Sequence, residues 1–84
     1  MKSLPVIDRA ATGANIARMR QQAGLSVQAL QEIFGFSTPQ AIYKWQRGSA
    51  LPTLDNMLIL SVVFNTTIDK IIVRVDAAVE RQSA

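Results

Sequence analysis

Between Gly35 and Gly48 the chain gathers side chains suited to recognition by hydrogen bonding. The amide of Gln40 can donate and accept at the same time, which lets it pair with adenine through two hydrogen bonds. The hydroxyl of Thr38 can also donate or accept, and the ammonium group of Lys44 can reach guanine or a phosphate. These residue types can hold a polyanion or read a base edge, whereas none of them is a strong nucleophile or base.

The rest of the residue inventory argues against catalysis. The chain has no histidine and no cysteine, so it lacks the commonest general base, the commonest metal ligand and any thiolate or disulfide. Of its six acidic residues, only Asp76 and Glu80 are close in sequence. We therefore expect no enzymatic activity, no bound metal and no cofactor.

Length, charge and hydropathy set further bounds. Eighty-four residues with a hydrophobic fraction of 49% predict one small folded domain. A net charge of +3 permits a polyanionic partner but does not require one. The longest apolar run, Met57–Phe64, is far shorter than the roughly 20 residues of a membrane span. The first residues lack the apolar core of a signal peptide, so a cytoplasmic location is expected.

We expect a short helix from about Pro39 to Arg47 to carry the recognition side chains, because proline suits a first helical position and Gly48 can end the helix. Ile42 and Trp45 are three residues apart and share one face. Trp45 is therefore predicted to anchor this helix on the core. The other face then presents Gln40, Tyr43, Lys44 and Arg47.

A second short helix is predicted directly before this one. Ser26 can cap it, and it runs to about Phe34, where Gly35 stops it. Ser37 and Thr38 are candidate caps for the following helix. Two short helices joined by a glycine-containing turn form a helix-turn-helix pattern. Because the major groove of B-DNA admits one helix, the pattern predicts a double-stranded DNA partner.

The position of each side chain on the second of these helices predicts its role. Thr38 and Gln40 lie at its start, which faces base edges in such a complex, and Lys44 lies one turn on, where it can reach guanine or a phosphate. Tyr43 and Arg47 are better placed for backbone phosphates, which supply affinity but not sequence preference. The alternative for these residues is an ordinary solvated face, and for Tyr43 it is half-buried packing.

Three more helices are expected in the chain. They span about 13–23, 54–64 and 68–72, after the candidate caps Thr12, Thr53 and Thr67. Residues 1–11 are expected to form an arm, residues 12–73 the domain, and residues 74–84 a tail. The tail has two interpretations, because Val73 and Val75 alternate as in a strand whereas residues 76–81 could be helical.

The helix expected at 54–64 is apolar nearly all round, and a small domain cannot bury all of it. Ile59 and Val62 are therefore candidate dimer-interface residues, together with Ile33. The alternative is that these residues are covered by the tail or by the arm, which carries Val6 and Ile7.

From about Asn15 to Val73 the chain resembles the Xre family of helix-turn-helix regulators, of the lambdoid phage repressor and Cro type. The similarity rests on three segments in register: "NIARMRQQAGLSVQALQEIFGFS", "AIYKWQRGSALPTLDNMLILSVVFN" and "TTIDKII". Within them, "R-x-x-x-G-L-S" and "W-x-R-G-x-x-x-P" are especially similar to the family. The resemblance implies an all-α, five-helix DNA-binding domain that has its helix-turn-helix in helices 2 and 3.

The resemblance also implies specific site residues and an assembly. The third helix would enter the major groove, usually in a homodimer on a palindromic operator. Thr38, Gln40 and Lys44 would read bases, and the start of the second helix would touch phosphate. The implied DNA-binding set is Thr38, Pro39, Gln40, Tyr43, Lys44, Arg47, Gln28 and Arg20. Of the two arginines at 18 and 20, one is expected to meet phosphate and the other solvent.

The chain departs from the family pattern at three places. One extra residue lies around Ser37–Pro39, which affects how the reading helix begins. Val27 stands where the family often has a phosphate-contacting glutamine, so Gln28 is its expected substitute. Gln31 replaces a small residue that usually faces the third helix, and it would need a hydrogen-bond partner if buried.

Two functions of different class follow from these patterns. The first is a sequence-specific DNA-binding transcriptional regulator. The second is an antitoxin-like or adaptor module, in which the helix-turn-helix is mainly a scaffold and the apolar fourth helix and the tail bind a protein.

Overall fold

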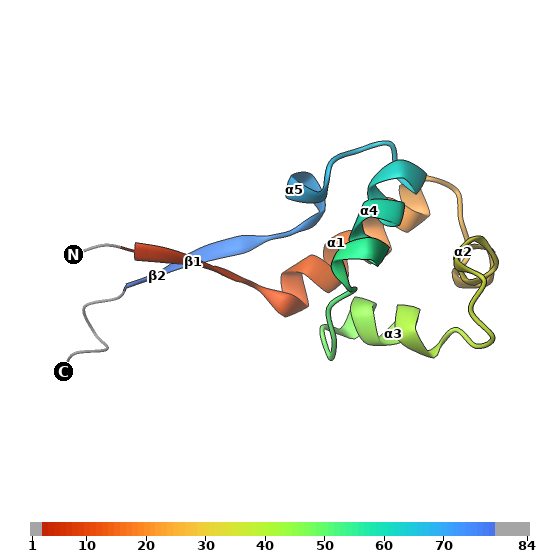
Figure 1. Cartoon of the computed structure of the whole chain (residues 1–84), viewed down its shortest axis with the longest axis horizontal. Helices are drawn as coiled ribbons and strands as arrows, with labels where there is room; N and C mark the ends of the chain where they lie inside the picture. Colours follow the sequence, from red (N-terminus) through yellow and green to blue (C-terminus); the bar gives the residue numbers. More distant parts are fainter. Residues whose placement is uncertain (1–2, 79–84) are drawn as a thin grey trace.

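The computed structural model describes residues 3–78 of the 84-residue chain. Its elements, in chain order, are β1 (Ser3–Ile7), α1 (Arg9–Gln22), α2 (Val27–Phe34), α3 (Gln40–Arg47), α4 (Leu54–Val63), α5 (Ile68–Ile71) and β2 (Arg74–Ala78). The helices gather into one body, and the two strands project from it as a ribbon at the end opposite α2 (Figure 1). The described residues therefore contain the five expected helices, with a small two-stranded sheet in addition.

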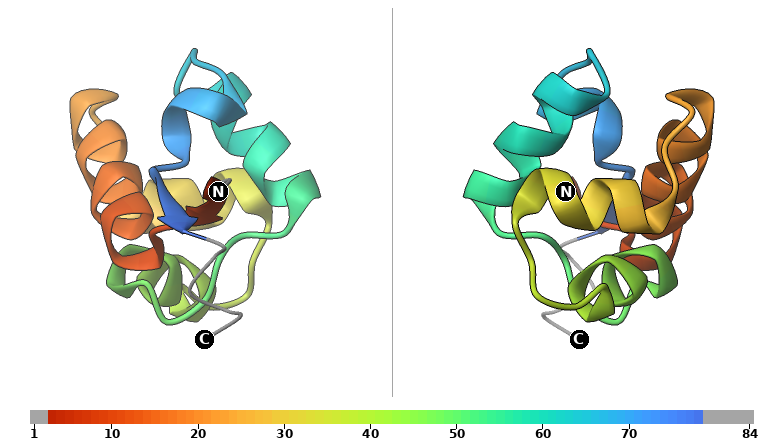
Figure 2. Two further views of the ribbon diagram at one scale, coloured as in Figure 1. Left: turned by 90° about the vertical axis from the view of Figure 1, so that its left-hand side faces the viewer. Right: turned by 90° about the vertical axis from the view of Figure 1, so that its right-hand side faces the viewer.

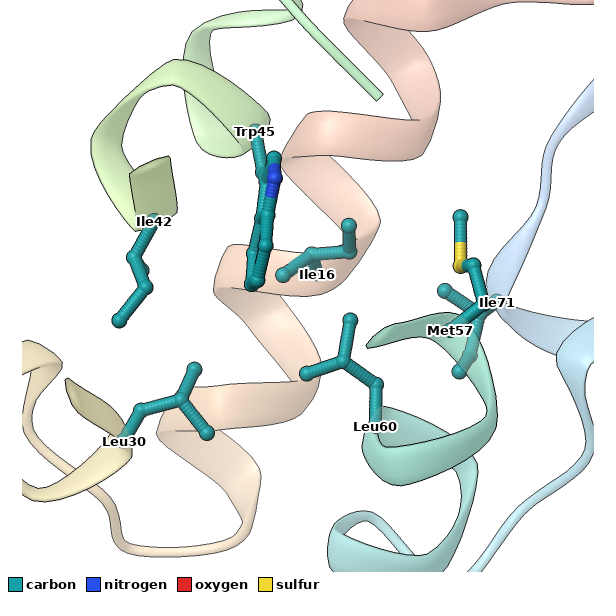
Figure 3. Packing of buried hydrophobic residues seen from close by; sticks show 7 residues of the cluster. All are labelled: Ile16, Leu30, Ile42, Trp45, Met57, Leu60 and Ile71. Atoms are coloured by element: carbon teal, nitrogen blue, oxygen red, sulfur yellow. The ribbon is translucent and has the colours of Figure 1, made fainter. Parts of the chain in front are cut away.

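Every helix contributes at least one side chain to a single apolar core. The buried apolar residues are Ile16, Leu30, Ile42, Trp45, Met57, Leu60 and Ile71, and they converge in the middle of the body (Figure 3). Burying one such aliphatic side chain stabilises the fold by about 1.5–3 kcal/mol. Viewed along the ribbon, α1 and α4 lie on opposite sides of the domain (Figure 2). Because the core joins all five helices, it fixes the position of α3 relative to the rest.

Helix α1 begins earlier than the sequence predicts. Asp8 is its N-cap, since an oxygen of the Asp8 carboxylate accepts a hydrogen bond from the Ala11 backbone N–H at 2.9 Å. The prediction of Thr12 as the cap is wrong, because Thr12 lies inside the helix and is fully buried. Aspartate caps a helix at least as well as threonine does, so the helix can begin at Arg9.

The Thr12 hydroxyl instead joins α1 to the end of the chain. Its oxygen accepts a hydrogen bond from the Val73 backbone N–H at 2.9 Å and lies 3.3 Å from the Val73 carbonyl, to which it donates. One turn later, the side-chain amide of Asn15 donates to the carbonyls of Lys70 and Ile71 at 3.0 and 2.8 Å. These bonds hold the segment after α5 against α1.

The two ends of the described chain pair with each other. Strand β1 lies antiparallel to β2, with Ser3 opposite Ala78 and Ile7 opposite Arg74. The arm expected at residues 1–11 thus contains a strand and the start of α1. The alternation of valines in the tail correctly predicted a strand, and the helical interpretation is wrong for residues 76–78. Residues 79–81 of that interpretation lie outside the described residues.

Helix α3 approaches α1 so closely that only glycine fits at the crossing. A Cβ added to Gly13 would overlap the carbonyl oxygen of Trp45 and lie 2.7 Å from that of Gln46. At the end of α3, Gly48 has a φ of +77° and lies against the backbone of Ala10. The backbone of α1 is therefore a rigid support for the C-terminal half of α3.

Candidate nucleic-acid interface

Helix α3 has one buried face and one exposed face, as the sequence predicts. Ile42 is 0% exposed and Trp45 is 4% exposed, and both point into the core (Figure 3). The prediction that Trp45 anchors the helix is confirmed. The exposed residues of α3 are Gln40, Tyr43, Lys44 and Arg47. Because they are spaced three or four residues apart, they form one continuous surface, here called the α3 polar face.

Three aromatic rings connect α2, the turn and α3. The Trp45 ring meets those of Phe34 and Phe36 edge to face, with centroid distances of 5.4 and 5.9 Å. Phe34 and Phe36 are stacked on each other at 5.0 Å. Each such pair contributes about 0.5–1.5 kcal/mol beyond simple burial. The rings therefore set the angle between α2 and α3 from inside.

The turn between α2 and α3 differs from the prediction at its second half. Gly35 ends α2 in the left-handed conformation, as expected. Pro39 then occupies the N-cap position of α3, and no side chain caps the helix. The predicted caps Ser37 and Thr38 are wrong, because the N-cap position belongs to Pro39, whose side chain cannot accept a hydrogen bond. Both residues are exposed in the turn before α3.

Gln31 has the hydrogen-bond partner that its position requires. Its side chain is half-buried, and the amide nitrogen donates to the Phe36 carbonyl at 3.1 Å. This bond closes the turn across the end of α2. The expected need of Gln31 for a hydrogen-bond partner is therefore met within the turn.

The three predicted base-reading residues lie around one shallow hollow. The hollow is lined by Phe36, Ser37, Thr38, Gln40, Ala41 and Lys44. The hollow places hydroxyl, amide and ammonium groups beside the apolar side chains of Phe36 and Ala41. This mixture suits the major groove, where hydrogen-bonding atoms of the bases lie next to the methyl group of thymine.

The remaining predicted contacts lie in different environments. Gln28 is exposed in the first turn of α2, and Pro39 is half-buried. The guanidinium of Arg20 is half-buried and donates to the side-chain oxygen of Gln46 at 2.9 Å and to the Leu25 carbonyl at 2.8 Å. Arg20 therefore connects α1, the loop after it and α3. Its role as a DNA contact stays a prediction.

One exposed cation near α3 was missed by the sequence reasoning. Arg9 donates from its guanidinium to the Ser49 carbonyl at 3.1 Å, which places it at the loop that follows α3. No sequence signal indicates this contact, because Arg9 lies in the expected arm and the two residues are 40 positions apart. Arg18 is exposed and donates to the Asn15 side-chain oxygen.

The charge of α3 favours an anionic partner. The helix carries Lys44 and Arg47 and no acidic residue. Its first backbone N–H groups have no side-chain cap, so no side-chain acceptor of the helix cap offsets the positive end of the helix dipole. Within residues 3–78 no group of three or more potential metal ligands occurs. The helices of that range are also too short or too polar to cross a membrane.

The predicted dimer residues on α4 are exposed. Val62 is 75% exposed and Ile59 is 40% exposed, and neighbouring Leu54 and Leu58 are 75% and 58% exposed. The alternative that the arm covers them is wrong for the described chain, since Val6 on β1 is itself 46% exposed. We call Leu54, Leu58, Ile59 and Val62 the α4 apolar face.

Comparison with known proteins gives a match to one family model and similarity to several solved structures. Residues 16–71 match the Helix-turn-helix family model HTH_3. The fold is similar to the restriction-modification controller protein C.AhdI from Aeromonas hydrophila, with a TM-score of 0.67 and 22% identity over 76% of this chain and 96% of that one. It is also similar to the S. venezulae BldD DNA-binding domain, with a TM-score of 0.65 and 18% identity over 77% of this chain and 96% of that one. No curated protein sequence matches.

Proposed function

The chain belongs to the Xre/Cro-type helix-turn-helix family, and on that basis we propose that it is a DNA-binding transcriptional regulator that places α3 in the major groove. The observation that carries the proposal is the two-sided α3. Its apolar side is fixed by Ile42 and Trp45, while the α3 polar face is exposed and carries no acidic residue. A helix that enters the groove must be held rigidly from behind and present hydrogen-bonding groups in front.

In this proposal the side chains at the start of α3 recognise the DNA sequence by contacting base edges in the major groove. Gln40 pairs with an adenine, and Lys44 reaches a guanine or a phosphate one turn later. Thr38 approaches the bases from the turn, since it lines the hollow together with Gln40 and Lys44. About three or four side chains of such a helix reach base edges, so α3 reads only a short half-site.

The flanks of the site bind the DNA backbone. Tyr43 and Arg47 lie on the α3 polar face, and Gln28 is exposed at the start of α2. Such contacts fix the register of the helix but do not select a sequence. Arg9 adds a further exposed cation at the loop after α3.

We further propose that the chain acts as a homodimer on a palindromic operator. Specific protein–DNA complexes have dissociation constants of roughly 10⁻⁸–10⁻¹¹ M. One module of this size makes few base contacts, so we expect that two modules are needed to reach this affinity. Two copies related by a two-fold axis read two half-sites, and this symmetry produces the palindrome. The α4 apolar face is one candidate dimer surface, as the sequence predicts.

Selection of bound DNA from a random pool tests the proposal. We expect the selected sites to share a two-fold symmetric motif, and binding to weaken steeply as the salt concentration rises. The matched variants are Lys44→Ala on α3 and Lys70→Ala on α5, which remove the same charge from exposed side chains. Lys44→Ala should weaken binding strongly and Lys70→Ala only slightly. Equal effects, or the absence of an enriched motif, would contradict sequence reading by α3.

A second candidate function is favoured by the α4 apolar face. Exposed apolar side chains at this spacing suit a protein partner, so the chain could act as an antitoxin-like or adaptor module. A gel-shift assay against genomic fragments at two salt concentrations distinguishes the functions. A shift that is lost at high salt supports the regulator, whereas no shift even at low salt supports the adaptor.

A further inference from the structure

The ribbon formed by β1 and β2 lacks a covering layer in the single chain. Its exposed apolar residues include Leu4, Val6 and Val75, at 51%, 46% and 49%. All three share one face, because the register pairs Val6 with Val75 and Leu4 is two residues from Val6. An isolated two-stranded ribbon is at best marginally stable in water. The ribbon nevertheless projects from the helical body (Figure 1), which indicates that something else completes it.

The two outer edges of the ribbon differ. The Asp8 backbone N–H donates to the Val73 carbonyl at 2.8 Å, in the same register as the strands. Asp8 and Val73 therefore form a hydrogen-bonded pair. Hydrogen-bonded and non-hydrogen-bonded pairs alternate along an antiparallel ladder, so Ile7–Arg74 and Pro5–Asp76 are non-hydrogen-bonded pairs, whose backbone N–H and C=O groups point away from the partner strand. At the centre of the β1 edge, Pro5 has no N–H to offer, so this edge is blocked.

The β2 edge is open and its charges are self-complementary. Arg74 and Asp76 direct their backbone N–H and C=O groups away from β1, and their side chains lie on the face opposite Val75. When two copies of β2 run antiparallel with Val75 opposite Val75, Arg74 of each copy lies opposite Asp76 of the partner subunit. In the same pairing the backbone of Arg74 forms hydrogen bonds with the backbone of Asp76 of the partner subunit. These two residues are the ones whose N–H and C=O groups point out of the open edge, so the register fits.

We propose that two copies of the chain dimerise by pairing their β2 strands about Val75, which gives a four-stranded sheet in the order β1–β2–β2–β1. The interface is isologous, as a two-fold dimer requires. It joins the apolar faces of the two ribbons and contains two Arg74–Asp76 pairs. In the single chain these residues form only an exposed ion pair, at 3.5 Å with side-chain exposures of 63% and 51%.

The size of this interface predicts a reversible dimer. A five-residue edge buries less surface than the roughly 1,200–2,000 Å² of a standard interface. We therefore expect monomer and dimer to exchange over an accessible concentration range, and a two-fold DNA site to favour the dimer by mass action. Dimerisation itself does not depend on the proposed function, although its use on an operator does.

Charge reversal with mixing tests the pairing in analytical ultracentrifugation. Arg74→Asp makes both positions acidic, and Asp76→Arg makes both basic, so each variant alone brings like charges opposite each other. We expect each to raise the dimer dissociation constant about tenfold or more, since like charges opposite each other destabilise a strand pair. An equimolar mixture should form heterodimers, because every cross-strand pair is then opposite in sign. The double variant Arg74→Asp/Asp76→Arg should dimerise as the natural chain does.

Further measurements separate this proposal from its alternatives. Circular dichroism should show unchanged helical content in both single variants, since their changes lie outside the helical core. Val62→Lys, on the α4 apolar face, should leave the dimer intact. If Val62→Lys abolishes the dimer, or if the two charge variants dimerise as well alone as when mixed, the β2 proposal is overturned. Half-site binding by the monomeric variants would show that the proposed DNA function stands regardless.

Discussion

At the scale of single residues, Gln40 is the side chain whose role can be tested most directly. It is exposed at the first position of α3, beside the hollow that Thr38 and Lys44 share. Gln40→Ala should weaken binding to the selected site by about 1–3 kcal/mol, because two hydrogen bonds to one base are lost. Non-specific binding should change little. Competition binding against specific and random duplexes measures both, and equal losses on the two would contradict base reading.

Arg47 is expected to act through charge alone. It ends α3 on the exposed face, where we expect a cation to meet phosphate rather than a base edge. Arg47→Ala should weaken binding by a similar factor on every sequence and lower the slope of log affinity against log salt by about 1. Titrations at four salt concentrations give the slope. A loss confined to the cognate site would instead assign a base contact to Arg47.

The sequence predicts the environment of a residue better than its partner. Trp45 could be assigned to the core because it shares a spacing of three with Ile42, and that assignment is confirmed. The need of Gln31 for a partner could be stated, but the Phe36 carbonyl could not be named. The contacts of Arg20 with Gln46 and Leu25 depend on how three elements meet, and no local pattern encodes that arrangement.

At the scale of elements, the crossing of α1 and α3 depends on Gly13. Alanine is normally preferred over glycine inside a helix by about 0.5–1 kcal/mol. Gly13→Ala should nevertheless destabilise the chain by about 1–3 kcal/mol, because the new methyl group overlaps the backbone of α3. Urea unfolding measures the change. Gln21→Ala, at an exposed position of α1, is the control and should lie within about 0.5 kcal/mol of the natural chain.

The attachment of the ribbon to α1 depends on the Thr12 hydroxyl. Thr12→Val keeps the shape but removes both hydrogen bonds with Val73, and the Val73 N–H then lacks its partner. We expect a loss of about 1–3 kcal/mol in the free energy of unfolding. Amide hydrogen exchange in β1 and β2 should also become faster. Thr12→Ser retains the hydroxyl and should recover most of the protection; no difference between the two variants would refute this role.

The helices could be predicted from the sequence, whereas the ribbon could not. Ser26, Thr53 and Thr67 cap α2, α4 and α5 as expected, since capping is a property of a few adjacent residues. Strand β1 pairs with a segment at the other end of the chain, and five residues with Pro5 among them carry no local strand signal. The alternation of Val73 and Val75 indicated a strand but not its partner.

At the scale of the whole molecule, the two proposals together predict a fixed spacing between half-sites. The bonds of Thr12 and Asn15 join the C-terminal segment to α1, and Gly13 joins α1 to α3. A β2-paired dimer should therefore hold its two α3 helices at one separation. Inserting five base pairs between the selected half-sites rotates one of them by about half a helical turn. Affinity should fall to that of a single half-site, as measured by fluorescence anisotropy.

The control for this experiment places the same five base pairs outside the half-sites, where affinity should not change. Retained high affinity after the internal insertion would mean that the two modules are flexibly joined. That result would contradict rigid attachment of the ribbon without affecting the role assigned to α3.

The pairing of Ser3 with Ala78 also determines how the chain responds to mechanical tension. A load applied to its two ends pulls the strands apart like a zipper, so the hydrogen bonds of the ribbon break one after another rather than all at once. Peeling of this kind needs little force, and it would stop where the Thr12 hydroxyl holds Val73. In an optical trap, the ribbon should extend first at low load, and the helical body should yield later in a separate step.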